Sequence, residues 1–243
     1  MLAALYAAVL AHLLADFLLQ SDRMCAEKSV DPRRGLGRHV ALVAAVNMLL
    51  LSFFGPVKAV SFAGLVAGAH LIIDGGKIWF ERRGEIRNGM LIFSLDQLLH
   101  LAVIGAVWHI VYKRLPLRLL PAGAAYLLAG SKLAAGEEIL LEIMVIAAAV
   151  YAGDVIIKLA LQEVSGYTDM KATSRYIGMA ERLLVIMLMQ MGEVGAIGFI
   201  FAAKSVARFQ KQDKEFASYY LLGTLLSLLL AIGAGQVLVA LGS

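Results

Sequence analysis

The chain has 243 residues, of which 60% are hydrophobic and only 16% are charged, and its mean hydropathy is +0.80. A soluble domain is nearer half apolar and about a quarter charged, so this composition argues against an ordinary soluble domain. The formal net charge of +4 is typical of membrane-protein loops that face anionic headgroups, and it is not evidence for nucleic-acid binding.

The apolar residues are gathered into segments about 20 residues long, the length that a helix needs to cross the hydrocarbon layer. A membrane-spanning backbone must satisfy its own hydrogen bonds, and the period-2 alternation of a barrel is absent. We therefore predict an all-α, polytopic transmembrane helical bundle with about seven spans. Their approximate bounds are 2–20, 39–55, 57–80, 91–112, 139–161, 177–203 and 219–241.

The predicted spans divide the chain into three parts. Residues 1–112 form a four-helix membrane unit, and residues 139–243 form a three-helix membrane unit. The connecting segment 113–138 could hold a short interfacial helix. The sixth span is interrupted near Gly192-Glu193. The first apolar segment lacks a basic leader and an A-x-A-like cleavage site, so we expect it to remain as a membrane helix.

Basic residues gather in the loops after the first and third predicted spans. The loop 21–38 holds five of them and the loop 81–88 holds three. The positive-inside rule places both loops in the cytoplasm and the N-terminus outside. Basic residues also follow the fourth and sixth spans, so the asymmetry between the two sides is small. Cys25 in the first loop is the single cysteine, which excludes an intramolecular disulfide.

Three histidine–aspartate pairs lie in the first, third and fourth predicted spans. They are His12/Asp16, His70/Asp74 and Asp96/His100. Residues four apart lie on one face of a helix, so each pair can direct two ligands toward one point. The first and third spans run in the same direction and read His then Asp. The fourth span runs the opposite way and reads Asp then His, which keeps each residue type at a matched depth.

The helical rise supports this convergence. At 1.5 Å per residue, the three aspartates lie about 6–9 Å inside the ends of their spans, and the three histidines about 12–15 Å inside. All six therefore enter from the same side. His39 begins the second span on that side and could cap the cluster, while Gln20 and Gln97 stand nearby as hydrogen-bonding partners.

This pattern predicts a metal site. A charged residue inside a membrane costs roughly 2.5–3.5 kcal/mol on insertion scales, and histidine supplies little positive charge at pH 7. Imidazole and carboxylate ligands suit zinc, iron or manganese, and we favour zinc. The predicted ligands are His12, Asp16, His39, His70, Asp74 and His100, with Asp96 as a further ligand or as the general base. A polar network that holds the bundle together or relays protons is the alternative.

The remaining ionisable residues are interpreted more simply. Asp154 and Lys158 are four residues apart and could neutralise each other within the fifth span. We interpret Glu181, Arg182 and Lys204 as structural pairs or headgroup contacts. We expect His109, which lies toward the other membrane face, to be interfacial.

Several segments resemble a known family. AHLLADFLLQ, AHLIIDGGK and LDQLLH resemble a bacterial family of polytopic membrane proteins, the domain-of-unknown-function family 3307. IGMAERLLV, AIGFIFAAKS and GTLLS resemble the C-terminal half common in those proteins. The resemblance covers most of the chain and implies a location in the bacterial inner (cytoplasmic) membrane. The ligand pattern is also similar to that of membrane-bound metal-dependent hydrolases, which are distantly like zinc phospholipases.

The leading hypothesis is a membrane-embedded metal-dependent hydrolase that acts on a lipid or other membrane-borne ester or phosphoester. Basic residues at the same end of the spans could hold an anionic headgroup, although ordinary positive-inside loops explain them equally well. These are Arg33, Arg34, Arg38, Lys77, Arg82 and Arg83. A divalent-metal transporter is the first alternative, but it needs access from both faces and the deeper half of these spans is apolar. A non-catalytic sensor or assembly factor is the second.

Overall fold

The structure is a computed structural model of the chain. The residues that it describes are 2–83, 88–113, 132–165, 172–209 and 214–242. Every secondary-structure element in these ranges is helical, so the prediction of an all-α fold is confirmed for them. Most of the predicted connecting segment, with its candidate interfacial helix, lies outside the described residues.

The chain divides into two compact units, Met1–Met144 and Val145–Ser243. Five helical segments of the described residues are long and apolar enough to cross a membrane, and a sixth is added if one bent helix pair counts as a single span. These long apolar helices indicate a membrane protein. The five segments are Pro32–Phe54, Pro56–Arg83, Gly89–Tyr112, Gly136–Val164 and Tyr219–Leu241.

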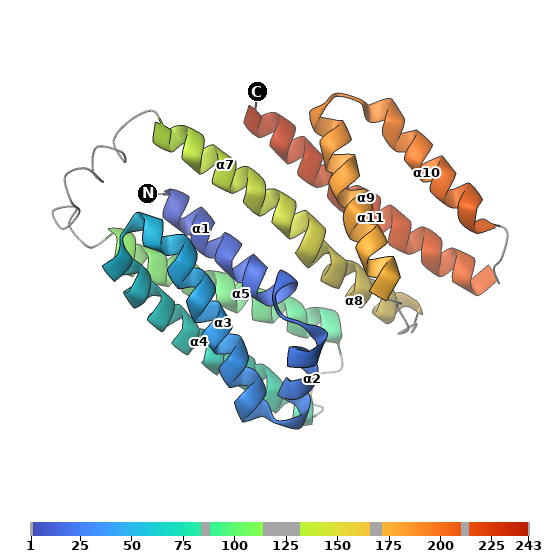
Figure 1. Ribbon diagram of the computed structural model, residues 1–243. Coiled ribbons are helices and arrows are strands. Elements are labelled where there is room, and N and C mark those ends of the chain that lie inside the picture. The colour runs from blue at the N-terminus through green and yellow to red at the C-terminus, as the bar shows by residue number, and fades with distance from the viewer. Residues whose placement is uncertain (1, 84–87, 114–131, 166–171, 210–213, 243) are drawn as a thin grey trace. The chain divides into compact units, whose positions relative to one another are not determined.

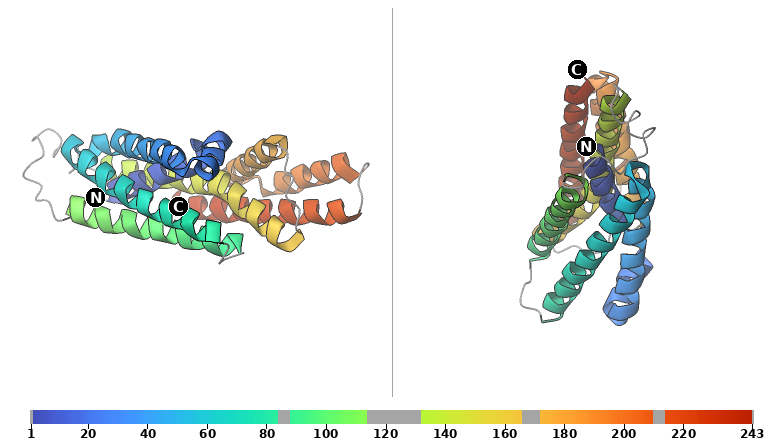
Figure 2. Two further views of the ribbon diagram at one scale, coloured as in Figure 1. Left: turned by 90° about the horizontal axis from the view of Figure 1, so that it is seen from below. Right: turned by 90° about the vertical axis from the view of Figure 1, so that its left-hand side faces the viewer.

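Four main helices build the first unit. Its elements are α1 (Leu2–Leu13), the π-helical turn η1 (Leu14–Leu18), α2 (Asp22–Val30), α3 (Pro32–Leu51), η2 (Ser52–Phe54), α4 (Pro56–Arg83), α5 (Gly89–Trp108), η3 (His109–Lys113) and most of α7 (Lys132–Ala147). In Figure 1, α1, α3, α4 and α5 lie side by side and α2 lies at one end of them. The neighbours α3 and α4, and α4 and α5, stay adjacent in the two further views (Figure 2).

An apolar core fills the first unit on the side away from α2. Small residues of α1, including Ala4, Ala7 and Ala8, are buried in it, and their size allows the neighbouring helices to approach closely. The rings of Phe62 and Tyr112 pack there with centroids 6.0 Å apart. Packed apolar side chains therefore fill this part of the unit.

The polar loop predicted at 21–38 contains a helix. Ser21 Oγ accepts a hydrogen bond of 3.3 Å from a backbone N–H in the first turn of α2, and the Asp31 carboxylate caps α3 in the same way. Pro32 occupies the first turn of α3, where its missing N–H is not needed. The chain bends by 78° between η1 and α2. The helix α3 begins at Pro32, seven residues before the start predicted for the second span.

Two arginines join α2 to the neighbouring helices. Arg38 Nη1 on α3 donates to Glu27 Oε1 and Oε2 at 2.5 and 2.7 Å, and Arg82 Nη2 on α4 donates to the Ser29 carbonyl oxygen at 2.9 Å. Both arginines belong to the set that could hold a headgroup. Their contacts hold α2 in place across one end of the unit.

The second unit contains a helical hairpin where one span was expected. Its elements follow α7 (Lys132–Ala147) and are η5 (Ala148–Ala152), α8 (Gly153–Ser165), α9 (Ala172–Gln190), α10 (Val194–Phe209) and α11 (Lys214–Gly242). Gly192 has φ of +77°, a conformation that glycine adopts at little cost, and it ends α9. The chain then turns back into α10 (Figure 1). The predicted interruption of the sixth span is therefore a reversal between two shorter helices.

The predicted orientation can be tested at Cys25, which is exposed on α2. We expect a membrane-impermeant maleimide to leave Cys25 unlabelled in intact cells and to label it in inverted vesicles. A Cys25→Ser, Ser52→Cys variant moves the thiol to η2, at the other end of α3, and should give the opposite pattern. Labelling of Cys25 in intact cells would reverse the assigned orientation.

The position of α2 depends on the absence of a side chain at Gly35. A β-carbon at Gly35 would lie 2.5 Å from the backbone nitrogen of Lys28, whereas one at Gly37 would meet nothing within 4 Å. Gly35→Ala should therefore destabilise the unit by about 1–3 kcal/mol, as overpacking does, and should speed maleimide labelling of Cys25. Gly37→Ala is the matched control. Equal thermal unfolding in detergent for both variants would contradict the close packing of α2 on α3.

Candidate metal centre

Seven ionisable side chains from five segments of the first unit lie together near α2. They are His12, Asp16, His39, His70, Asp74, Asp96 and His100. Asp16 belongs to η1, and the others come from α1, α3, α4 and α5. All except Asp16 are buried, and the Asp16 side chain is only 9% exposed. The structure thus brings all six predicted ligands and the predicted base to one place.

The four histidine rings contact one another in series. His39 Nε2 and His70 Nε2 are 2.8 Å apart, so one imidazole can donate a hydrogen bond to the other. The His70 and His100 ring centroids are 4.1 Å apart, and His100 stacks on His12 with centroids 5.1 Å apart. The ring nitrogens of helices distant in sequence are therefore close enough to share a ligand.

Two carboxylates flank the pair of facing imidazoles. Asp16 Oδ1 is 3.5 Å from His39 Nε2 and 3.7 Å from His70 Nε2. Asp74 Oδ2 is 3.7 Å from His39 Nε2, and Asp74 Oδ1 is 3.7 Å from both His70 Nε2 and His100 Nε2. Asp74 is thus the carboxylate that connects the histidines of α3, α4 and α5.

Among the described residues, three groups have ligand atoms close enough to hold a metal ion, with all atoms of a group within 4.8 Å of one another. They are His12/Asp16/His70, His39/His70/Asp74 and Asp74/Asp96/His100. Because His70 and Asp74 each belong to two groups, the groups form one connected set. This set could hold one ion with many ligands or two ions with fewer ligands each.

The clearest sign of a ligand is the position of His100. His100 Nδ1 lies 2.8 Å from the Asp96 carbonyl oxygen, one turn earlier in α5. A carbonyl oxygen only accepts hydrogen bonds, so Nδ1 donates, and Nε2 is the ring atom that can face a ligand. His100 Nε2 is buried, has no hydrogen-bond partner among the described residues, and is 3.7 Å from Asp74 Oδ1. Metal-binding histidines are commonly held in this way, with the second ring nitrogen donating to a carbonyl or carboxylate.

Gln97 orients His12 similarly. Gln97 Oε1 lies 3.1 Å from His12 Nε2, which therefore donates, and the other ring nitrogen faces Asp16 Oδ2 at 3.6 Å. The Gln97 amide nitrogen donates to Asp96 Oδ2 at 3.1 Å. One glutamine thus fixes both a histidine of α1 and a carboxylate of α5.

Two lysines neutralise part of the cluster. Lys28 Nζ on α2 lies 2.6 Å from Asp74 Oδ2, and Lys77 Nζ on α4 lies 3.1 Å from Asp96 Oδ2. Gln20, with its amide oriented to satisfy both ends, accepts from Lys28 Nζ at 2.9 Å and donates to a backbone carbonyl of η1 at 3.1 Å. Lys77 is one of the basic residues that could hold a headgroup, and its ammonium forms an ion pair with the cluster.

Sequence reasoning missed Lys28 because residues 21–38 were interpreted as a loop. The signal that could have found it is Ser21, a residue typical of the position before a helix, followed by a segment of suitable length. The Lys28 and Lys77 side chains are 14% and 30% exposed. The cluster therefore approaches the surface at the end where α2 lies, while the apolar core closes its other side.

The comparison with known families concerns this same part of the chain. Residues 4–120 match the sequence model of a family described as Protein of unknown function (DUF3307). The first half of the chain belongs to this family. This match confirms the family resemblance predicted for the first half of the chain. All seven cluster residues lie within the DUF3307 region. No curated protein and no solved structure matches the chain.

The metal-binding capacity of the cluster can be measured directly. We expect purified protein to hold a divalent transition metal. Changing both His70→Ala and Asp74→Ala should lower the metal affinity more than about tenfold, because even loss of a residue that only hydrogen-bonds to a ligand lowers metal affinity by about that factor. His109→Ala is the matched control, because His109 is exposed at the start of η3. Elemental analysis decides this. A wild-type protein without metal that cannot be reloaded would refute the site.

Proposed function

We propose that the DUF3307 region is a membrane-embedded metal-dependent hydrolase. A divalent transition metal, with zinc as our preference, would be held by the histidine–aspartate cluster. The substrate would be a lipid or another membrane-borne ester or phosphoester. The observation that carries this proposal is the position of His100 Nε2, which is buried, faces the Asp74 carboxylate and has no hydrogen-bond partner among the described residues.

A cation would satisfy two buried atoms at once. Asp16 Oδ1, like His100 Nε2, is buried and has no hydrogen-bond partner within the described ranges. Leaving a buried acceptor unsatisfied costs about 1–3 kcal/mol, and more for a charged group. A hydrogen-bond network alone leaves that cost in place, whereas metal ligation uses these lone pairs. Nitrogen and oxygen ligands without cysteine fit a catalytic zinc site better than a structural thiolate site.

Asp96 is the residue that we assign as general base. Its Oδ2 atom is held by Lys77 and Gln97, and its Oδ1 atom is buried at 3.6 Å from His100 Nδ1. A bound divalent ion would polarise the scissile group and make a nearby water more acidic. Asp96 would accept a proton from the attacking water, and the oxygen of that water would bond to the carbonyl carbon or phosphorus. The ester bond to the alcohol would break, and Asp96 would return the proton to the departing oxygen.

The position of the cluster favours a substrate that comes from the membrane. The cluster lies among long apolar helices and approaches the surface at one end, where Lys28 and Lys77 are partly exposed. Arg33 and Arg34 are exposed nearby on the first turn of α3. These cations can attract an anionic headgroup toward the carboxylate-bound end of the site.

The same geometry gives less support to a transporter. A transport route needs polar access on both sides of the ion site. On the side away from α2, the first unit is filled by the apolar core that contains Phe62 and Ile104. A site that opens at one end suits a fixed catalytic metal.

The hydrolase proposal is tested by separating metal binding from turnover. Asp96→Asn should retain the metal and lower turnover about 10²–10⁴-fold, the usual effect of losing a general base. His12→Ala should lose metal and turnover together. A screen of membrane-lipid extracts, with products identified by mass spectrometry, measures turnover, and His109→Ala is again the control. Metal flux into proteoliposomes that Asp74→Asn stops would instead establish a transporter.

A further inference from the structure

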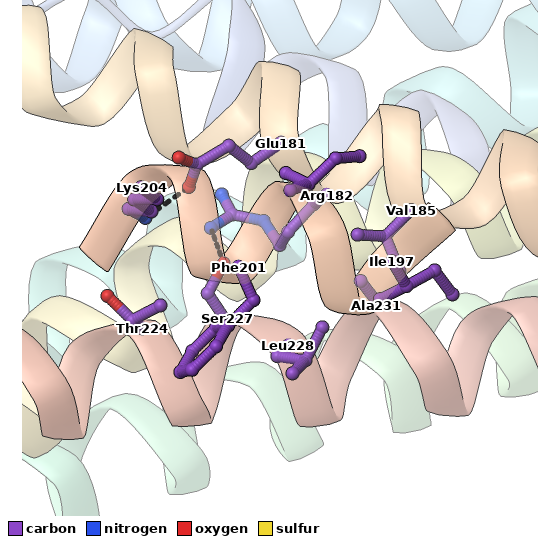
Figure 3. Close-up of a pocket in the computed structure, with 11 residues that line it drawn as sticks. Glu181, Arg182, Val185, Ile197, Phe201, Lys204, Thr224, Ser227, Leu228 and Ala231 are labelled. Carbon is purple, nitrogen blue, oxygen red and sulfur yellow. Dashed lines mark hydrogen bonds and ion pairs between the residues drawn. The ribbon is translucent and has the colours of Figure 1, made fainter. Parts of the chain in front are cut away.

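The charged side chains around the pocket between α9, α10 and α11 in the second unit form neutral pairs (Figure 3). Lys204 on α10 bonds to Glu181 on α9, and Arg182 lies 3.6 Å from Asp154. These pairs do not select a charged ligand. The metal centre of the first unit differs, because three carboxylates meet two lysine ammonium groups there.

Each of these two lysines binds one oxygen of an aspartate. Lys28 Nζ lies 2.6 Å from Asp74 Oδ2, and Lys77 Nζ lies 3.1 Å from Asp96 Oδ2. The other oxygens face an imidazole, since Asp74 Oδ1 is 3.7 Å from His100 Nε2 and Asp96 Oδ1 is 3.6 Å from His100 Nδ1. Each of the two carboxylates thus has one oxygen that is already bound to a cation.

Asp16 has a different set of neighbours. Its Oδ1 atom is buried without a hydrogen-bond partner, 3.5 Å from His39 Nε2 and 3.7 Å from His70 Nε2. Its Oδ2 atom is 3.6 Å from His12 Nδ1. No lysine or arginine in the described ranges forms an ion pair with Asp16. The carboxylate that lacks an ammonium is therefore the one that most needs a cation from outside the chain.

The charge of the cluster suits one divalent ion. Histidines that bind a metal are neutral, so three carboxylates and two ammonium groups leave one negative charge. One divalent ion changes this to one positive charge, whereas a second ion would raise it to three among apolar helices, where like charges repel strongly. Glu81 also interacts with Lys77, but it is exposed and screened by water.

The ligand atoms lead to the same number of ions. Of the three groups that can hold an ion, two contain Asp74, and one of these also contains Asp96. The lysines already occupy one oxygen of each of these aspartates. The group without a lysine contact is His12/Asp16/His70. The two ammonium groups thus take both the charge and part of the ligand set that a second ion needs.

We propose that the ammonium groups of Lys28 and Lys77 take the place of a second metal ion, so that the cluster binds a single divalent ion. This inference rests on the proposed metal centre and adds the number of ions that it holds. It also gives α2 a role in the chemistry, because Lys28 is supplied from outside the long apolar helices. A hydrolase of this kind works with one metal and a carboxylate base, without a second metal.

The number of ions can be counted on the full chain in detergent after equilibration with zinc. Elemental analysis should give one zinc per wild-type chain and two per chain of the Lys28→Met, Lys77→Met double variant, because a second ion then restores the lost charge. Manganese can replace zinc for electron paramagnetic resonance. Two ions about 4 Å apart, as in two-metal sites, give an exchange-coupled spectrum that ions bound singly at the surface do not give.

Affinity distinguishes this role from a structural one. Lys28→Met alone should raise the zinc affinity at least about tenfold, the size of effect seen when groups around metal ligands are changed, because a competing cation is removed. A lysine that only supports the fold would lower the affinity when lost. Lys28→Arg keeps the charge and should behave like wild type in a competition assay with a chelating dye.

The matched control is the double variant Arg33→Met, Arg34→Met. Both arginines are exposed on the first turn of α3, so this variant loses the same charge without touching the cluster, and it should bind one ion. Two coupled manganese ions in wild type would overturn the proposal. So would a single ion in the folded Lys28→Met, Lys77→Met variant, or lower affinity in Lys28→Met. A wild type that binds no metal would instead refute the metal centre itself.

Discussion

Three aspartate carboxylates lie among apolar helices in the first unit, and the cost of placing them there governs its structure. Asp74 and Asp96 are each compensated by a lysine ammonium, at 2.6 and 3.1 Å, whereas Asp16 faces the imidazoles of His12, His39 and His70. An uncompensated carboxylate at this depth is costly to insert. Both lysines are therefore part of what allows the cluster to be buried.

The need for a cation beside Asp74 explains why the segment between the first two membrane helices is ordered as α2. Lys28 reaches Asp74 only if α2 lies against α3 and α4. The arginine contacts to Glu27 and Ser29 and the missing side chain at Gly35 establish that position. Residues outside the apolar segments thus complete a site inside them, and the end of the unit that they cover is where the cluster meets the surface.

Sequence alone predicts the features that depend on residues close together in the chain, and it does not predict contacts between helices that are distant in the chain. The convergence of His12, His70 and His100 was predictable, because spacing of four residues and alternating helix direction are local rules. The ion pair between Lys28 and Asp74 was not, since it depends on how α2 packs against helices distant in sequence. The reversal at Gly192 was also beyond sequence reasoning, because a glycine inside an apolar segment is compatible with either a kink or a turn. The sharing of Asp154 by Arg175 and Arg182 is likewise a tertiary arrangement.

The carboxylates of the first unit are only partly compensated by the cations beside them. In the candidate metal centre, three carboxylates meet two lysine ammonium groups and four imidazole rings. In the second unit, by contrast, Arg182 pairs with Asp154, and Lys204 pairs with Glu181. Ionisable side chains within membrane segments are costly and generally functional. The partly compensated carboxylates of the first unit therefore favour a cation as the ligand of the histidine–aspartate cluster.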